Sequence, residues 1–297
     1  MQEAIRKAEV LTEALPYIQK YYDRIVVVKM GGSLMDDRDA ERQLLRDIVF
    51  MNYVGMQPII VHGGGKEINA AMNEAGLEPH FVEGLRYTDE RTLAIAEHVL
   101  CGQINKRLVA GLQEFGCNAV GLHSLSSCVL FGERMFLEGD NNRRIDIGFV
   151  GKVTEVNAQI LRLLVQSDTI PVIAPIARDR AGGRLNINAD LAAGEVAAAL
   201  RAEKLVMLSD THGIRADMKN PDSYYPSLAR WQVEQLVKEG VINKGMLPKV
   251  QACLRALECG VGKAHIIDGR FAHSLLLEIF TDKGVGTEIL SQDAAGK

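Results

Sequence analysis

Three consecutive glycines (63–65) join an apolar run to a helical pattern in the segment PIIVHGGGKEI, residues 58 to 68. The spacing excludes two common phosphate-binding loops. A Walker A loop needs Ser or Thr after its lysine, whereas Glu67 follows Lys66, and a dinucleotide-binding loop needs glycine where Ile68 stands. Successive glycine N–H groups at a helix start can still form a concave anion site. The alternative is a tight turn that needs only the backbone freedom of glycine.

A second glycine pair, Gly31 and Gly32, follows Lys29 at the end of the run VVVKMGGS. A lysine inside a buried parallel strand would be costly, but at the end of the strand its ammonium group can project over the crevice beside the glycines. The alternative is a surface lysine followed by a turn. Because two early strands both end in glycine clusters, and one cluster includes a lysine, the pattern favours a phosphate site.

Polar side chains alternate with apolar ones in RLNINAD, residues 184 to 190. An extended chain places Asn186, Asn188 and Asp190 on one side, directly before a helical pattern. Two amides and a carboxylate on one face suit a polar ligand. Asp190 as a plain helix N-cap is the alternative, and it leaves both asparagines unexplained.

Arg86 stands in LRYTDERTL, just before a helix that we expect Thr88 to cap. Its guanidinium group can offer a planar fork to a carboxylate. The alternative is a surface salt bridge to Glu83 or Asp89.

The second half of the chain supplies another strand with a polar end, LVMLSD, which closes on Ser209 and Asp210. It also supplies Gly245 and Met246 before a helix that carries Lys249 in its first turns. The helix dipole and the lysine together would hold the outer phosphates of a nucleotide. A generic amphipathic helix start is the alternative.

Apolar β-branched runs and helical patterns alternate along the chain, which predicts an α/β fold with a mostly parallel sheet. Ligands of such sheets bind beyond the carboxyl ends of the strands, where the polar residues above stand. The predicted strands are 25–29, 58–61, 118–121, 170–174, 204–208 and 264–267. The predicted helices are 3–22, 39–54, 65–75, 89–115, 154–166, 190–202, 229–239 and 247–259. Short alternating runs between about 126 and 150 predict β-hairpins.

Composition excludes several classes of protein. The 297 residues carry a formal net charge of −4, which argues against nucleic acid as a partner, and 47% are hydrophobic, which argues against disorder. No apolar run approaches the roughly 20 residues of a membrane span, and the N-terminus does not resemble a signal peptide. The five cysteines form no C-x-x-C pair, so we expect reduced thiols and a cytoplasmic location.

Two glycine clusters, two lysines and an Asp–Asn face suit phosphoryl transfer, which depends on positioning and charge stabilisation. A carboxylate acceptor has a pKa of about 4 and is already ionised at pH 7, so it needs no general base. His62 is then a hydrogen-bonding scaffold residue rather than a base.

These motifs, in order from about residue 25 to 290, resemble N-acetylglutamate kinases of the amino-acid kinase fold. The motifs are KMGGS, VHGGGKEI, GLRYTDERTL, GFVGKVTEVN, LNINADLAAGEVA, GMLPKV and HIIDGRFAHSLLLEIFTDKGVGTEI. The resemblance implies a three-layer αβα fold with an interaction helix (1–24), an amino-acid lobe (25–197) and an ATP lobe (198–297). It also implies transfer of the ATP γ-phosphate to the side-chain carboxylate of N-acetyl-L-glutamate, in arginine biosynthesis, with Mg²⁺ and no metal ligand from the protein.

The resemblance also implies roles for individual residues. Lys29 and Lys249 would stabilise the transferring phosphoryl group from opposite sides, and Asp190 would orient both lysines. Gly63 and Gly64 would donate N–H groups, and Arg86 would grip the α-carboxylate of the substrate. The remaining assignments are substrate contacts from Asn186 and Asn188, and ATP or phosphate contacts from Gly31, Gly32, Ser209, Asp210, Gly245 and Met246.

The sequence departs from the family pattern at two places. A Ser-Gly-Lys-Asp-like turn is replaced in VGLHSLSS (120–127), and Asn243-Lys244 replaces a glycine-rich approach to the last helix. Two rival functions therefore stay open. One is a kinase of the same fold with another acceptor, such as another carboxylate, carbamate or a nucleotide. The other is a weakly catalytic arginine-sensing regulator, which would not need both lysines.

The first 22 residues carry an apolar stripe with spacing 4-3-4-3-4 that must be buried, either in the chain's own core or against the same helix of another subunit. Relatives with such a helix resemble arginine-inhibited hexamers, built as trimers of dimers, which predicts a hexamer and L-arginine as inhibitor here. The resemblance places the arginine site at His265, Glu278, Gly284 and Gly286.

Overall fold

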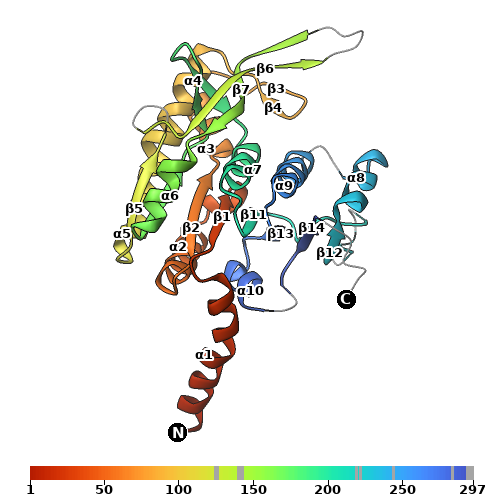
Figure 1. Ribbon diagram of the computed structural model, residues 1–297. Coiled ribbons are helices and arrows are strands. Elements are labelled where there is room, and N and C mark those ends of the chain that lie inside the picture. Colours follow the sequence, from red (N-terminus) through yellow and green to blue (C-terminus); the bar gives the residue numbers. More distant parts are fainter. Residues whose placement is uncertain are drawn as a thin grey trace.

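A computed structural model describes residues 1–123, 127–138, 144–217, 220, 223–242, 245–281 and 284–291. An eight-stranded sheet in the order β12-β14-β13-β11-β1-β2-β8-β5 forms its centre (Figure 1). All neighbouring strands from β13 to β5 are parallel, and β14 pairs antiparallel with β13. The strands are β1 (Ile25–Met30), β2 (Gln57–His62), β5 (Asn118–Leu122), β8 (Thr169–Ile173), β11 (Lys204–Ser209), β12 (Ser227–Ala229), β13 (Lys263–Asp268) and β14 (Thr287–Leu290).

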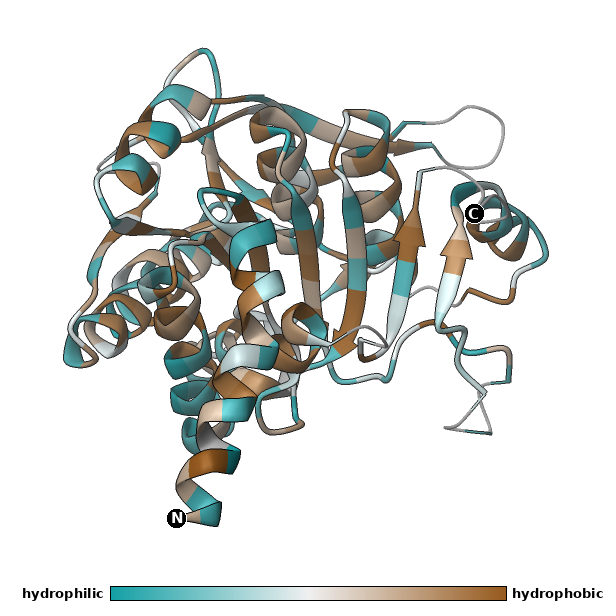
Figure 2. Ribbon diagram, turned by 60° about the horizontal axis from the view of Figure 1, so that its bottom comes forward, coloured by the Kyte–Doolittle hydropathy of each residue, from teal (hydrophilic) through white to brown (hydrophobic). Residues whose placement is uncertain are grey.

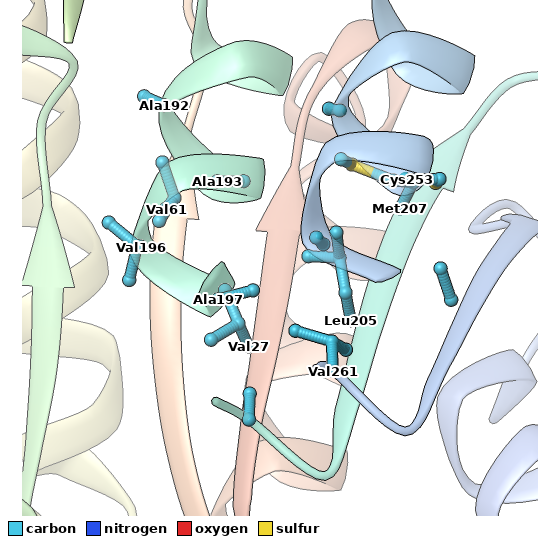
Figure 3. Packing of buried hydrophobic residues seen from close by; sticks show 14 of the residues in the cluster. Val27, Val61, Ala192, Ala193, Val196, Ala197, Leu205, Met207, Cys253 and Val261 are labelled. Carbon is cyan, nitrogen blue, oxygen red and sulfur yellow. The ribbon is translucent and has the colours of Figure 1, made fainter. Parts of the chain in front are cut away.

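Helices cover both faces of the sheet, because its strands are apolar on both sides. On one face Val61 lies beside Val196, and Met207 lies beside Cys253, as Figure 3 shows. On the other face Val28 lies in a second apolar cluster. The first face carries α6 (Ala158–Gln166), α7 (Ala189–Leu200), α8 (Arg230–Lys238) and α9 (Leu247–Glu258). The second carries α2 (Arg38–Tyr53), α3 (Gly65–Glu74), α5 (Asn105–Glu114) and α10 (Ser274–Phe280).

Between α3 and β5 lie the two-stranded ribbon β3 (Phe81–Val82) and β4 (Leu85–Arg86), helix α4 (Glu90–Glu97) and a π-helix, η2 (His98–Ile104). A further four strands close on one another in the order β10-β7-β6-β9. They are β6 (Leu130–Glu138), β7 (Arg144–Val156), β9 (Ile176–Arg178) and β10 (Arg184–Ile187). The antiparallel β6–β7 pair confirms the predicted hairpin.

The α/β prediction and all six predicted strands are confirmed, with ends that differ by at most one residue. The helix predicted at 154–166 begins only at Ala158, because β7 continues to Val156. The helix predicted at 89–115 is divided into α4, η2 and α5. Thr88 does not cap α4: the cap is Asp89, whose carboxylate accepts the N–H of Thr92.

Helix α1 (Gln2–Tyr21) continues through Pro16 and projects from the body of the molecule (Figure 1). Its apolar stripe is not buried in the chain's own core, since Leu11 is 68% and Leu15 is 49% exposed. Brown apolar segments alternate with teal polar ones along this helix in Figure 2. Across the described part of the chain, no helix is long and apolar enough to cross a membrane.

Helices α7 and α9 approach each other at Gly194. A Cβ added at this glycine would lie 2.8 Å from the carbonyl oxygen of Ala252 and 2.9 Å from its Cα. Only a residue without a side chain fits so close to another backbone. This contact fixes the starts of the two helices relative to each other.

Candidate active site

Two lysines share one buried carboxylate at the carboxyl edge of the sheet. Lys29 Nζ lies 2.8 Å from Asp190 Oδ1, and Lys249 Nζ lies 2.9 Å from Asp190 Oδ2. Lys29 comes from the end of β1, Asp190 from the first turn of α7, and Lys249 from the first turn of α9. The structure thus brings together the three residues to which the family resemblance gave related roles.

The charges of this triad depend on one another. Burial alone would raise the pKa of Asp190, but the ammonium groups of Lys29 and Lys249 outweigh it and lower the pKa to about 2. Burial lowers the pKa of Lys29, and the charge of Lys249 adds to this effect, while Asp190 opposes it. Asp190 is thus an anion at neutral pH that is paired with both lysines.

The glycine clusters surround the lysine from β1. The side chain of Lys29 folds back over Gly31, and a Cβ at Gly31 would push its ammonium end out of the present position. Gly31 precedes a 3₁₀ helix, η1 (Gly32–Met35), while Gly64 is the N-cap of α3. The glycines and the ammonium group therefore meet at one cavity. The prediction that the N–H of Gly63 is a donor to the ligand is wrong, because this N–H donates to the carbonyl oxygen of Met30 at 2.8 Å.

A cavity of about 220 Å³ opens between these glycines and the lysine. The predicted residues that line it are Lys29, Gly31, Gly63, Gly64, Arg86, Asn186, Asn188 and Asp190. The structure therefore brings together the predicted residues of the first 190 positions, apart from Gly32, around one volume.

Arg86 is buried and held on three sides. Its Nη2 donates to the carbonyl oxygen of Gly65 at 3.0 Å, and its Nη1 lies 3.3 Å from the sulfur of Met72. The guanidinium group lies 4.9 Å from the centre of the Phe81 ring. Neither the aromatic ring nor the carbonyl partner was predicted. Phe81, three residues before the glycine of the GLRY motif, was the available signal.

The two asparagines play different parts. Asn188 caps α7, because its Oδ1 accepts the N–H groups of Asp190 and Leu191. The N-cap of α7 is therefore Asn188, and not Asp190 as the alternative interpretation supposed. Asn186 donates to the hydroxyl of Thr88 at 3.2 Å, which ties β10 to the segment that precedes α4.

The residues predicted from the second half lie at the end of β11 and the start of α9. Ser209 ends β11, and its hydroxyl lies 3.4 Å from a carboxylate oxygen of Asp210. Met246 is the N-cap of α9 and, with Gly213, Ile214 and Ile242, lines a small apolar cleft. Gly245 directly precedes Met246, whereas Asn243 and Lys244 lie outside the described residues, as do residues 124–126 of the unusual turn.

A separate polar cavity of about 320 Å³ brings together the four residues predicted to bind arginine, His265, Glu278, Gly284 and Gly286. Glu278 accepts from Lys204 at 3.1 Å and from the N–H of Val285 at 3.0 Å, and His265 Nδ1 lies 2.6 Å away. Tyr17 and Lys20 of α1 also line this cavity.

Comparison with known proteins agrees with this geometry. Residues 24–268 match the model of the amino acid kinase family. The acetylglutamate kinase of Heliobacterium modesticaldum is 48% identical over 294 residues, covering 98% of this chain and 100% of that protein. The acetylglutamate kinase of Synechocystis sp. is 47% identical over 290 residues, covering 98% of this chain and 95% of that protein.

Solved structures give the same fold. N-acetylglutamate synthase from Neisseria gonorrhoeae, complexed with coenzyme A and N-acetyl-glutamate, matches with a TM-score of 0.84 and 26% identity, covering 96% of this chain and 64% of that one. Carbamate kinase from Giardia lamblia bound to AMP-PNP matches with a TM-score of 0.68 and 17% identity, covering 91% of this chain and 99% of that one, which supports the fold alone. From its family match and its near full-length relatives, the chain belongs to the amino acid kinase family.

Proposed function

We infer that this chain is an acetylglutamate kinase, which transfers the γ-phosphoryl group of ATP to the side-chain carboxylate of N-acetyl-L-glutamate in arginine biosynthesis. The full-length likeness to acetylglutamate kinases supports this assignment. The observation that carries it is the Lys29–Asp190–Lys249 triad beside a cavity with an arginine at its wall.

We propose that the acetylglutamate lies in the 220 Å³ cavity, with its α-carboxylate at Arg86 and its side-chain carboxylate near the glycines. The reacting carboxylate is an anion at pH 7 and attacks without losing a proton. The two lysines then stabilise the negative charge of the transferring phosphoryl group from two sides, while Asp190 keeps them in place.

ATP would approach from the second half of the chain. The apolar cleft at Met246 suits a purine ring, and the N-terminus of α9 with Lys249 suits the phosphates. Mg²⁺ would be held chiefly by the phosphates, since Asp190 already pairs with two lysines and the described residues contain no group of three metal-binding side chains. The ion would neutralise phosphate charge. On this basis we keep the division into an amino-acid lobe (25–197) and an ATP lobe (198–297) as a proposal, and the cytoplasmic location as a prediction.

The direct test measures ADP release with ATP, Mg²⁺ and N-acetylglutamate, and traps the acyl phosphate with hydroxylamine as a hydroxamate. A panel of other acceptors (glutamate, aspartate, carbamate and a nucleoside monophosphate) tests the rival kinases. Preferential turnover of another acceptor would overturn the assignment, and absence of turnover together with arginine binding would favour the regulator.

Replacing Arg86 by lysine should raise KM for the acceptor about 10-fold or more and leave KM for ATP nearly unchanged. Lysine keeps the charge but loses the planar fork that holds a carboxylate. Arg91→Lys, at an exposed position of α4, is the matched control. Equal changes in both KM values would assign Arg86 a structural role instead.

We also propose that L-arginine inhibits the enzyme from the 320 Å³ cavity. The four predicted residues line it, and its acidic side chains Glu278 and Glu288 suit a guanidinium group. The guanidinium would have to share Glu278 with Lys204 and His265, so binding would redistribute existing ion pairs. Because α1 supplies Tyr17 and Lys20, the cavity couples the ligand to the predicted subunit contact.

Deleting residues 1–22 should convert a hexamer into dimers and weaken arginine inhibition, because the exposed stripe of α1 would no longer cover its partner. The mass in solution and the arginine concentration for half-inhibition are the measurements. In the full chain, the double change Leu11→Asp and Leu15→Asp should act like the deletion, whereas Glu13→Ala should not. A dimeric full-length protein, or a truncated protein that is still hexameric and inhibited, would contradict this proposal.

A further inference from the structure

His62 is fully buried directly before the three glycines and makes contacts on both sides of its ring. Its Nδ1 lies 2.9 Å from the carbonyl oxygen of Gly63, and its Nε2 lies 3.2 Å from Nδ2 of Asn105. Asn105 is also buried and is the first residue of α5, directly after the π-helix. His62 is not among the residues that line the 220 Å³ cavity, so it lies behind the glycines rather than beside the substrate.

The surroundings determine which ring nitrogen carries the proton. Nδ2 of Asn105 donates to the carbonyl oxygen of Val172 at 2.8 Å, and a carbonyl can only accept, so the amide nitrogen must face this side. The same nitrogen then donates to Nε2 of His62, which must be unprotonated. The proton of the neutral ring is therefore on Nδ1, where it is donated to Gly63. Burial lowers the pKa of His62 to about 4, so the ring is neutral at pH 7.

These contacts fix the orientation of two successive peptide groups. The N–H of Gly63 donates to the carbonyl oxygen of Met30 at 2.8 Å, and the carbonyl of Gly63 accepts from His62. In a trans peptide the N–H of the next residue points away from that carbonyl, so the N–H of Gly64 points away from His62. In the described part of the chain, the N–H of Gly64 has no protein acceptor.

The π-helix supports the same glycine from another side. A Cβ at Gly64 would lie 2.5 Å from Cδ1 of Ile104 and 2.8 Å from Cδ2 of Leu100. Gly64 is thus held between apolar side chains and the cavity. Glycine has no side chain and can adopt many backbone conformations, so contacts with neighbouring residues determine the direction of the Gly64 N–H.

We propose that His62 and Asn105 are positioning residues: through a Nδ1–H donor to the Gly63 carbonyl, they aim the N–H of Gly64 at the transferring phosphoryl group. The aim at a phosphoryl group rests on the proposed kinase function, whereas the proton position on His62 does not.

Two substitutions separate this role from simple packing. An asparagine places its Nδ2 near the position of the imidazole Nδ1, whereas a glutamine places its Nε2 near the imidazole Nε2. His62→Asn should keep kcat within about 3-fold of the parent enzyme, while His62→Gln should lower kcat about 10- to 100-fold with a smaller change in KM, because a misdirected N–H stabilises the transition state poorly. If His62 only filled space, His62→Gln should retain more kcat than His62→Asn, because glutamine is nearer to histidine in size. Equal losses, or a larger loss in His62→Asn, would overturn the proposal.

Stability and tautomer provide readouts that are independent of turnover. Melting temperatures show whether either variant fails to fold, with Leu112→Ala, in the same helix as Asn105, as a core control that should leave kcat unchanged. Nitrogen-15 NMR of the imidazole in the complete, unmodified chain should find the neutral Nδ1–H tautomer at pH 7. The Nε2–H tautomer would overturn the proposal even in an active enzyme, and failure of the acetylglutamate assay would overturn the kinase assignment while leaving the tautomer result intact.

Discussion

Replacing Lys29 or Lys249 by alanine should lower kcat at least ~100-fold and change KM much less. The physical reason is that negative charge on the phosphoryl oxygens is redistributed in the transition state, between two ammonium groups that Asp190 already holds in place. An interaction that strengthens only in the transition state appears in kcat. Steady-state kinetics with both substrates varied is the measurement.

The matched control is Lys238→Ala, at an exposed position of α8. This variant should have the kcat of the parent enzyme, because its ammonium group lies in solvent and outside the triad. Near-normal kcat in the Lys29 or the Lys249 variant would show that this lysine does not stabilise the transferring phosphoryl group. Circular dichroism of the Lys29 and Lys249 variants would show whether a fall in kcat results from loss of folding or from loss of catalysis.

Asp190→Asn should lower kcat about as strongly and should also destabilise the fold, by about 3–5 kcal/mol, because it leaves two buried ammonium groups without a counter-charge. In the parent protein, the lysines keep the pKa of Asp190 at about 2, below the roughly 3.9 of an unfolded aspartate. This stabilisation is therefore fully present above about pH 4 and is lost as the pH falls through about 2.

Urea unfolding of the parent and Asp190→Asn proteins at several pH values measures this contribution. The difference in free energy of unfolding should be constant from pH 7 to about pH 4 and should shrink below it. A difference that stays constant to pH 2 would show that the carboxylate charge is not what stabilises the triad. A Cys253→Ala variant, one helical turn after Lys249, controls for the loss of packing at this depth.

The sheet was predictable because its strands are buried on both faces and read as continuous apolar runs, as in VVVKM before Gly31. Lys29 was expected at the carboxyl edge of the sheet because β1 ends there. Asp190 follows β10, which belongs to the separate four-stranded sheet, so its meeting with the two lysines was implied by the family resemblance and not by the order of the strands. Among the elements that were not predicted, β12, β14 and α10 are three to seven residues long, too short to show a hydrophobic period.

Several side-chain contacts of the site could not be predicted from the sequence, because they form between segments that are distant along the chain. The nearness of Phe81 to Arg86 in the sequence was a weak signal for their contact, but the sequence gives no sign that Asn105 donates to His62, 43 positions earlier. Asn188 was correctly expected at the cavity, but its capping of α7 depends on a backbone turn that an alternating pattern hides. The sequence motifs therefore predicted which residues lie near the cavity. Which residue donates to which could be determined only from the structure.

The close approach of α7 and α9 at Gly194 limits how the two helices can move relative to each other. Asp190 lies one turn before Gly194, and Lys249 lies one turn before Ala252, so the charged pair and the backbone contact sit at the same crossing. Closely packed backbones compress little, which makes this crossing a stiff link between the helices that carry Asp190 and Lys249. We expect any opening of the two halves to pivot about this crossing, so that Lys249 moves little while the outer walls of the cleft move most. Ligands would then enter and leave without separating Lys249 from Asp190.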